Sequence, residues 1–367
     1  MKAASRELEA VNSAQENLSV ERREVFWGPL LAWYATHRRD LPWRRATDPY
    51  AVWVSESMLQ QTKVNTVIPY YERFIERFPS VRALAESEVD EVLGLWSGLG
   101  YYSRARRLHA AAVQLVEDHG AEFPRDRRAA EALPGVGAYT AGAVLSIAYG
   151  LEERLIDGNV QRVLARWFAV KGIVTKAGPR RVIEDMAGAL VDGVGDPGSW
   201  NQALMELGAT VCLPQAPRCE SCPIFSECEA QALGLQAALP ELAAKPAPID
   251  VELEVFVISD RGRVLLRKRG EEGRMAGLWE LPTREIAIDE PRLFPLELEV
   301  HLLRGEEVGL IRHSITKHRI QARVLCADLG VKDLPPEWAW FSLAELEDLG
   351  LTGMTSKALA KARASLR

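Results

Sequence analysis

Four cysteines within a short segment are the clearest candidates for metal chemistry in this sequence. Cys212, Cys219, Cys222 and Cys228 follow the pattern C-x6-C-x2-C-x5-C, whereas Cys326 lies alone in a segment that alternates like a β-strand. In a reducing compartment, thiols this close together favour metal ligation over disulfide formation. Tetrahedral thiolate sites commonly hold zinc, and four cysteines without a histidine suit a 4Fe-4S cluster equally well. The residues alone leave both metals open.

A second segment with chemical potential is the turn at residues 133–137, within the stretch ALPGVGAYTAGAV. Gly135 and Gly137 lack a β-carbon, so they allow the backbone to turn tightly and to approach a partner closely. Backbone N–H groups at such a turn, directly before a helix, form a site for phosphate. The turn therefore predicts a phosphate-containing ligand, and Tyr139 follows it immediately.

The elements that must position these residues belong to two different classes. From residue 22 to 229, apolar residues recur at spacings of three and four between short Gly/Pro turns, which is typical of amphipathic helices. Residues 230–250 are small and rich in proline, which predicts a linker. Strand patterns and a closing helix pattern follow over residues 251–367. The sequence thus predicts a multidomain protein with an all-α part, a C-terminal α+β domain and an N-terminal extension over residues 1–21.

The composition is that of a globular protein. Of the 367 residues, 47% are hydrophobic and 26% are charged, which excludes disordered and fibrous classes. No apolar run approaches the ~18 to 20 residues of a membrane span, and the charged N-terminus is unlike a signal peptide, so we expect a cytoplasmic protein without a membrane partner. The net charge of -6 does not exclude nucleic acid, because binding depends on whether basic residues collect on one face.

Five sequence blocks, together with the cysteine pattern, resemble the helix-hairpin-helix DNA glycosylases of the endonuclease III superfamily, and within it the MutY type of adenine DNA glycosylase. The blocks are LPWR (41–44), DPYAVWVSESMLQQTKV (48–64), GLGYYSRARRLH (98–109), LPGVGAYTAGAV (133–144) and DGNVQRVLAR (157–166). The resemblance runs from residue 27 to 228 and implies a 4Fe-4S cluster on the four cysteines. It also implies that the partner is double-stranded DNA with adenine opposite 8-oxoguanine or guanine. We expect a monomer, associated with the nucleoid if the source is bacterial.

Position 139 separates the two main branches of this superfamily. Endonuclease III-like enzymes carry a lysine there, whose amine attacks the sugar and allows strand cleavage. This chain has Tyr139, which cannot form a Schiff base. We therefore expect base excision without an efficient lyase step, with the phenol hydrogen-bonded inside the catalytic pocket. The alternative enzyme, a pyrimidine-lesion glycosylase with lyase activity, is disfavoured by the same residue.

Excision of adenine breaks a glycosidic bond through a transition state with positive charge on the sugar and negative charge on the leaving base. One protonated and one ionised carboxyl group suit this task. The resemblance assigns Glu56, whose apolar neighbours would raise its pKa, as the general acid and later activator of water. It assigns Asp157 to stabilise the oxocarbenium ion, as an ion or through a transient covalent bond, and Asn159 to orient Asp157.

Each carboxyl group has a simpler interpretation when it is taken outside the motif. Asp157 would be a helix N-cap, and Glu56 a solvated helix residue. A capping aspartate can also be catalytic. The pairing of the two carboxyl groups disfavours a non-catalytic DNA-binding or redox-sensing iron-sulfur protein that has kept the fold, because sensing requires neither.

The resemblance also places residues around the flipped nucleotide. Three match positions that line the family's adenine pocket: Trp43, Arg44 and Gln202. Extrusion of the adenine leaves a gap in the duplex, and Gln61 and Tyr101 match the wedge and stacking residues near it, with Leu99 assisting. Further contacts to DNA, mainly to phosphate, are expected from Thr62, Gly135, Gly137 and Arg218.

Residues 251–367, with the stretch LLRKRGEEGRMAGLWELP, resemble the Nudix-like domain that MutY-type enzymes use to inspect 8-oxoguanine. No R-E-x-x-E-E metal motif follows Trp279, so we expect no pyrophosphohydrolase activity. The family's recognition loop carries Phe-Ser-His after a histidine. With His313 as that histidine, residues 315–317 occupy those places, and we expect the hydroxyl group of Thr316 to bind 8-oxoguanine. His318 is displaced by one position from the family's pattern.

Overall fold

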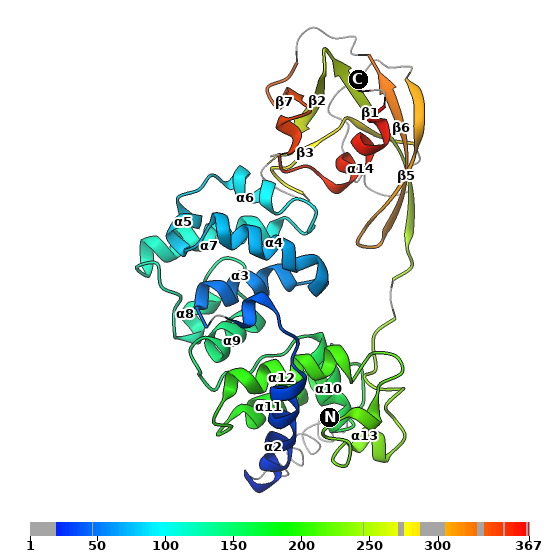
Figure 1. Ribbon diagram of the computed structural model, residues 1–367. Helices are drawn as coiled ribbons and strands as arrows, with labels where there is room; N and C mark the ends of the chain where they lie inside the picture. The colour runs from blue at the N-terminus through cyan, green and yellow to red at the C-terminus, as the bar shows by residue number, and fades with distance from the viewer. Residues whose placement is uncertain are drawn as a thin grey trace. The chain divides into compact units, whose positions relative to one another are not determined.

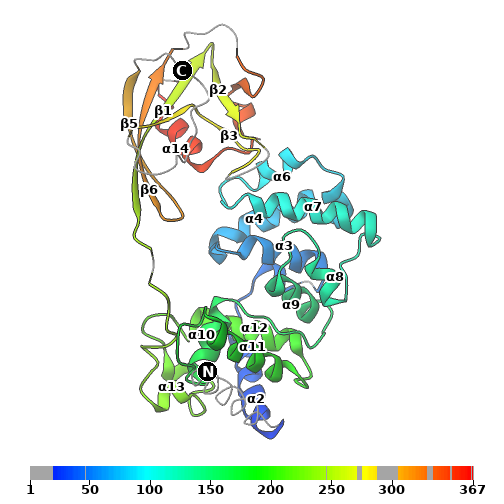
Figure 2. The same cartoon turned by 180° about the vertical axis from the view of Figure 1, so that it is seen from behind.

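The computed structural model describes residues 20–45, 47–244, 246–270, 275–286, 305–328, 334–347, 349–364 and 366 (Figures 1 and 2). They divide into two compact units, one within residues 1–75 and 114–244 and the other within residues 76–113 and 245–367. Residues 1–19 of the expected N-terminal extension lie outside the described part of the chain. Among the described helices, none combines the length and the apolar character needed to cross a membrane.

The first unit consists of helices joined by turns. In chain order they are α2 (Val20–His37), the short 3-10 helix η1 (Pro42–Arg44), α3 (Pro49–Leu59), α4 (Val64–Arg77), α8 (Arg127–Glu131), α9 (Ala138–Ile147), α10 (Gly158–Trp167), α11 (Ala177–Val191), α12 (Pro197–Thr210), η2 (Cys219–Ser221) and α13 (Glu229–Ala232). Helices α3, α10 and α12 each begin after an aspartate whose side chain accepts a hydrogen bond from a backbone N–H of the first turn.

Helix α10 shows how the apolar spacing fixes an element in this unit. Val160, Val163, Leu164 and Trp167 recur at helical intervals, and all four are buried in one core with residues of α2, α11 and α12. Because these side chains anchor the helix, its N-terminal cap, Asp157, has a fixed position at the edge of the core.

The helix-hairpin-helix consists of α8, the turn at residues 133–137 and α9. Gly135 has a φ of +78°, in the left-handed region where a residue with a β-carbon is disfavoured. Gly137 caps α9 with a φ of -100°, which any residue adopts, and a β-carbon there would touch nothing. The expectation that the turn itself requires glycine is therefore right for Gly135 and wrong for Gly137, where only the close approach of a partner could require it.

The second unit combines helices with a mixed sheet. Its elements are α5 (Val81–Ala85), α6 (Val89–Leu95), α7 (Ser103–Asp118, which ends in the first unit), β1 (Ile249–Asp260), β2 (Arg263–Lys268), β3 (Trp279–Glu280), β4 (Thr283–Glu285), β5 (Glu306–Ile315), β6 (His318–Ala327), β7 (Trp338–Ser342), the 3-10 helix η3 (Glu345–Glu347) and α14 (Gly353–Ala362). The strand order is β3-β2-β1-β6-β5, with β4 paired to β1 and β7 to β2. Strands β1 and β6 are parallel, and the other pairs are antiparallel.

The central strand β1 is buried on both faces. Leu253, Val255 and Val257 belong to the core that includes α14, whereas Phe256 and Ile258 belong to a second core on the opposite face. This alternation follows from the two-residue period of a strand. The expected α+β class of the C-terminal part is confirmed.

Candidate active site

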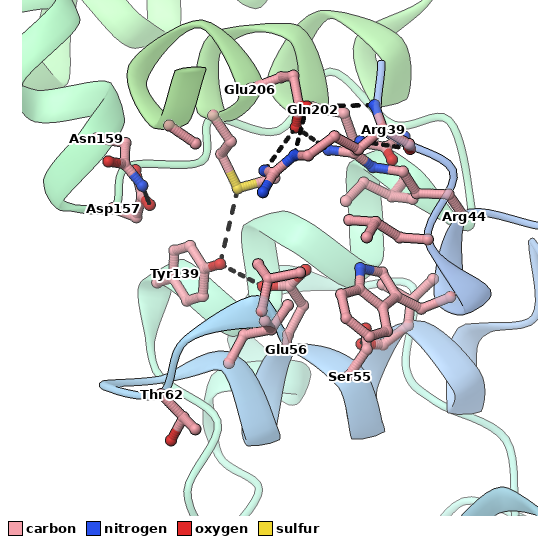
Figure 3. A pocket seen from close by; sticks show the side chains of 18 residues that line it. Arg39, Arg44, Ser55, Glu56, Thr62, Tyr139, Asp157, Asn159, Gln202 and Glu206 are labelled. Carbon is pink, nitrogen blue, oxygen red and sulfur yellow. Dashed lines mark hydrogen bonds and ion pairs between the residues drawn. The ribbon is translucent and has the colours of Figure 1, made fainter. Parts of the chain in front are cut away.

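A pocket of about 180 Å³ lies in the first unit, lined by residues of η1, α3, α9, α10 and α12 (Figure 3). Seven residues that the sequence pointed to line it together: Trp43, Arg44, Glu56, Tyr139, Asp157, Asn159 and Gln202. Thr62, expected at the DNA, also lines the pocket. Residues from five separate sequence segments thus meet in one space.

Glu56 is a buried carboxyl group on α3, with 4% of its surface exposed. Helix α3 is buried from Tyr50 to Met58, so no face of this segment is left for solvent. Burial raises the pKa of Glu56 to about 7, and the nearby charge of Asp157 adds to the rise, while the hydrogen bond from Tyr139 and the charge of Arg44 oppose it. A solvated helix residue is therefore the wrong interpretation, and Glu56 can hold a proton near neutral pH.

Tyr139 is the second residue of α9, directly after the hairpin, and its phenol points at Glu56 (Figure 3). Its Oη donates a hydrogen bond to Oε2 of Glu56 and lies 3.7 Å from Sδ of Met205. Burial, together with the charges of Glu56 and Asp157, raises the pKa of Tyr139 well above its usual value. The phenol therefore stays protonated and acts as a donor, which leaves Oε1 of Glu56 as the oxygen that can carry a transferable proton.

Asp157 is both a helix cap and a pocket residue. Its Oδ1 accepts a hydrogen bond from the Val160 N–H at 2.7 Å, and its Oδ2 accepts one from Nδ2 of Asn159 at 2.8 Å. Burial raises the pKa of Asp157, while these hydrogen bonds favour its ionised form. The geometry therefore fixes the carboxylate in one orientation, and the capping interpretation and the orienting role of Asn159 are compatible.

Asn159 is held in turn by the neighbouring helix. Its Oδ1 accepts a hydrogen bond from Nη2 of Arg162 at 2.8 Å, and the same nitrogen donates to the carbonyl of Gly208 on α12 at 2.7 Å. A β-carbon at Gly208 would lie 2.6 Å from Cβ of Asn159. Only glycine allows α12 to approach this closely, and sequence analysis did not identify Gly208 or Arg162 as supports of the site.

A second buried carboxylate, Glu206, was also missed. It is fully buried on α12, and its oxygens accept from Nε and Nη2 of Arg39 at 2.7 and 2.9 Å and from Nη2 of Arg44 at 2.8 Å (Figure 3). Burial acts to raise the pKa of Glu206, but these hydrogen bonds outweigh it and hold the pKa below its usual value. The sequence did contain a signal for Glu206, because a negative charge four residues after Gln202 on an otherwise apolar helix requires a cationic partner.

A larger cavity of about 390 Å³ shares Tyr139 and Asp157 with the pocket. Its wall includes three arginines: Arg127, Arg154 and Arg180. Arg127 is fixed by ion pairs to Glu131 and Glu153, and its Nη2 donates to the Ala138 carbonyl at 3.0 Å. Glu184 also lines this cavity and pairs with Arg180 at 2.7 Å, so its wall carries both charges, with the arginines in excess.

Three of the residues expected at the DNA share an uncommon backbone conformation. Gln61, Tyr101 and Thr316 have φ values of 60°, 50° and 52°, in the left-handed region that disfavours side chains with a β-carbon. Such residues persist where the surroundings over-determine them, and they concentrate at functional sites. All three are exposed, whereas Leu99 is buried.

The loop expected to recognise 8-oxoguanine is the two-residue turn between β5 and β6, formed by Thr316 and Lys317. His313 lies on β5, half-buried, with its Nδ1 3.4 Å from Nζ of Lys357. Burial lowers the pKa of His313, and the charge of Lys357 lowers it further. His318 is buried, with Nδ1 3.3 Å from the Ile315 carbonyl, so it is directed into the hairpin.

The four cysteines gather between α12 and α13. Three of them, Cys212, Cys222 and Cys228, pack against the core of the first unit. Burial raises the pKa of Cys222 to about 12, and the charges of the other three thiols add to the rise because the sulfur atoms lie near one another. In the described part of the chain, no three His, Cys, Asp or Glu side chains are arranged to hold a single metal ion.

The surroundings of the cysteines contain basic groups. Nη1 of Arg166, buried on α10, donates to Sγ of Cys212 at 3.3 Å. Arg218, exposed, directly precedes η2. A set of four thiols in one loop fits a cubane cluster, in which each thiolate binds its own iron.

Comparison with known proteins defines the class. Residues 54–187 match the HhH-GPD superfamily of base excision DNA repair proteins, and residues 254–361 match the NUDIX domain family. A thermostable thymine-DNA glycosylase structure is 31% identical, covers 58% of this chain and 98% of its own, and gives a TM-score of 0.53. An endonuclease III–DNA complex shares the fold at 20% identity, 59% and 99% coverage, and a TM-score of 0.50. The fold and site are those of a helix-hairpin-helix DNA glycosylase with a C-terminal Nudix-like domain.

Curated relatives narrow this class to one family. The adenine DNA glycosylase of Homo sapiens is 35% identical over 404 residues, which cover 92% of this chain and 73% of the relative. The adenine DNA glycosylase of Schizosaccharomyces pombe is 32% identical over 411 residues, with 91% and 88% coverage. The chain belongs to the adenine DNA glycosylase family. It is a base excision repair enzyme that acts on the N-glycosyl bond of adenine in DNA.

Proposed function

We propose that this enzyme, as a monomer, removes adenine placed opposite 8-oxoguanine or guanine in double-stranded DNA, by hydrolysis and without cutting the strand. The observation that carries the proposal is the buried carboxyl group of Glu56, with a pKa of about 7, beside the oriented carboxylate of Asp157. A carboxyl group that holds a proton, beside a second one whose oxygens accept hydrogen bonds that favour the ionised form, suits the departure of a base from a sugar.

Glu56 acts as the general acid in the first step. The bond between the anomeric carbon and adenine breaks, and its electron pair leaves with the base while Glu56 protonates the ring nitrogen at position 7. The hydrogen bond from Tyr139 to Oε2 directs the proton to Oε1. In the second step the Glu56 carboxylate takes a proton from water as the water oxygen bonds to the anomeric carbon, which yields free adenine and an abasic site.

Asp157 stabilises the positive charge that develops on the sugar between these two steps. The hydrogen bonds from the Val160 N–H and from Asn159 hold its oxygens in place before the reaction, so no reorganisation is needed when charge appears. The arginines of the larger cavity, which Asp157 also lines, suit the phosphates that flank the flipped nucleotide.

The adenine itself is held by Trp43, Arg44 and Gln202. Trp43 offers a buried aromatic face, and Glu206 fixes the guanidinium group of Arg44. Gln202 has its Oε1 3.2 Å from the Tyr34 hydroxyl group and its Nε2 3.3 Å from the Gly198 carbonyl. An amide with both ends held is oriented to present its remaining hydrogen-bonding capacity to the base.

Tyr139 supports the monofunctional character of the reaction. A phenol cannot form the Schiff base that strand cleavage by a lyase requires. Its hydrogen bond commits Tyr139 to Glu56, so the side chain orients an acid instead of attacking the sugar.

We further propose that Cys212, Cys219, Cys222 and Cys228 hold a 4Fe-4S cluster, which cross-links the loop that carries Arg218. The gathering of the four thiols and the buried Arg166 that donates to Cys212 support this donor set. Arg218, exposed at the start of η2, is then available to contact a DNA phosphate.

A direct assay tests the proposed function. The purified full chain is incubated with duplexes that place adenine opposite 8-oxoguanine, guanine or thymine, with and without alkali to reveal abasic sites. We expect strand breaks only after alkali, with adenine opposite 8-oxoguanine cleaved fastest and opposite thymine slowest. Breaks without alkali, or efficient trapping of a protein-DNA adduct with borohydride, would contradict the monofunctional mechanism.

A further inference from the structure

The loop at residues 97–102, between α6 and α7, presents an aromatic ring to solvent on an unusual backbone. Tyr101 is 54% exposed and has a φ of 50°, and Gly98 and Gly100 beside it have φ values of 100° and 72°. The carbonyl of Gly100 accepts hydrogen bonds from Nε1 of Trp96 at 3.2 Å and Nη2 of Arg104 at 3.1 Å. A left-handed residue with a β-carbon requires such external support, so this loop is held in place.

One further support comes from a distant part of the sequence. Tyr102 is 6% exposed, and its hydroxyl group accepts a hydrogen bond from the Gly98 N–H at 3.2 Å. The same hydroxyl donates to the carbonyl of Leu351, 249 residues later in the chain, at 3.0 Å. A single oxygen atom therefore links the loop that carries Tyr101 to the C-terminal domain.

The acceptor of this hydrogen bond is itself fixed in the sheet of the second unit. The Trp279 N–H on β3 donates to the carbonyl of Gly350 at 2.9 Å, and the Thr352 N–H donates to the carbonyl of Trp279 at 3.0 Å. Leu351 is consequently paired with β3 as a short parallel bridge. The position of its carbonyl is set by the Nudix-like fold.

Two further contacts join helices α6 and α7 to the C-terminal part of the second unit. Lys268 of β2 pairs with Asp90 of α6 at 2.7 Å. Gly277 has a φ of 72°, which favours glycine, and a β-carbon there would lie 2.0 Å from Nη1 of Arg106, so the guanidinium group of this α7 residue lies against the chain before β3.

From this geometry we propose that Tyr102 is a positioning residue for opposite-base specificity, because it fixes the Tyr101 loop relative to the Nudix-like domain. The inference rests on the proposed recognition of 8-oxoguanine opposite adenine. Tyr101 would stack near that base, whereas Thr316 would bind its edge. Two contacts made by one compact unit reinforce each other only if their spacing is fixed, so a loosened loop weakens binding of the duplex that makes both contacts.

The test is Tyr102→Phe in the full chain, which removes the hydroxyl group and keeps the ring. Tyr149→Phe is the matched control, because the Tyr149 hydroxyl donates to the Phe123 carbonyl at 2.6 Å in the first unit. Single-turnover excision and dissociation constants are measured on adenine opposite 8-oxoguanine and opposite guanine. We expect Tyr102→Phe to reduce the preference for 8-oxoguanine about three- to tenfold. Only excision and binding of the duplex with adenine opposite 8-oxoguanine should weaken. The control should leave the preference unchanged.

Two further measurements distinguish a failure of the proposed function from a failure of the role proposed for Tyr102. Hydrogen exchange of the amides in residues 97–102 should accelerate in Tyr102→Phe but not in Tyr149→Phe. Asp90→Asn, which weakens the same interface at its surface, should shift the preference in the same direction by a smaller factor and serves if Tyr102→Phe does not fold. A wild-type enzyme without any preference would refute the proposed function, whereas a preference that persists in variants with a loosened loop would refute the role of Tyr102 alone.

Discussion

Tyr139 on α9 and Glu56 on α3 are joined by a hydrogen bond from the phenol to Oε2 of the carboxyl group, in the wall of the pocket. The hydrogen bond favours the ionised form of Glu56, whereas burial favours the protonated form and outweighs it. The acid is therefore poised near neutral pH. This balance can be altered in either direction by substitution.

The first prediction concerns the pH dependence of excision. Because Glu56 must be protonated, the single-turnover rate should be highest on the acid side and fall as pH rises through about 7. Tyr139→Phe removes the hydrogen bond that lowers the pKa of Glu56, so the midpoint of this fall should move to higher pH. The measurement is the rate against pH for both proteins. An unchanged midpoint in Tyr139→Phe would mean that another group is the acid.

The second prediction concerns Glu206, which neutralises Arg44 at the pocket. Glu206→Gln leaves the charge of Arg44 uncompensated, and that charge lowers the pKa of Glu56, so the midpoint should move to lower pH, opposite to the effect of Tyr139→Phe. Arg39 is 39% exposed and can turn to solvent, whereas Arg44, at 10%, cannot. The free energy of unfolding should fall by up to about 3 kcal/mol, measured by urea denaturation. Arg45→Gln, which removes an exposed pair with Asp40, is the matched control.

The third prediction separates catalysis from binding. Asp157→Asn keeps the shape and the helix cap but removes the charge facing the cation, so excision should fall by about a hundredfold or more while duplex binding remains. Glu56→Gln should lower the rate by about 10² to 10⁴, because an amide cannot protonate the base. Single-turnover kinetics and binding titrations check both. A near-normal rate in Asp157→Asn would contradict its assignment, and recovery of Glu56→Gln at low pH would indicate another acid.

The fourth prediction concerns the metal. The isolated protein should be yellow-brown and contain about four irons per chain, because four thiolates bind one cubane. Cys222→Ser should lower the iron content, whereas Cys326→Ser, which alters the cysteine outside the cluster segment on β6, should leave it unchanged. Metal analysis after anaerobic, iron-replete expression decides the matter. One zinc per chain under those conditions would exclude the cluster.

The fifth prediction concerns recognition of 8-oxoguanine by the tip of the β5–β6 hairpin. Thr316→Val removes a hydroxyl group without changing shape, and a good contact to a base edge contributes roughly 1–3 kcal/mol. The preference for 8-oxoguanine over guanine should therefore fall about tenfold to a hundredfold, while Thr316→Ser should retain most of it. Competition between the two duplexes measures this ratio. A full preference in Thr316→Val would assign recognition to Gln61 and Tyr101.

The sequence by itself determined the local elements and pointed to residues that line one pocket. Apolar spacing located α10, and alternation located β6, because each pattern records which face of one element is buried. The motif blocks named Glu56, Tyr139 and Asp157, and the pocket contains all three. The periodic patterns succeeded because each depends on neighbours within a few residues along the chain, whereas the catalytic roles of the three pocket residues stay predictions.

Only the tertiary structure decided how segments far apart in sequence support one another. The pairing of Glu206 with Arg39, across 167 residues, and the close approach of Gly208 to Asn159 depend on how α12 packs, which no local period records. The grouping of residues 76–113 with the C-terminal domain, and the hydrogen bond from Tyr102 to Leu351, have the same origin. Periodicity specifies which face of an element is buried, but the complementary shapes and charges of two surfaces select the partner, and they exist only once the chain has folded.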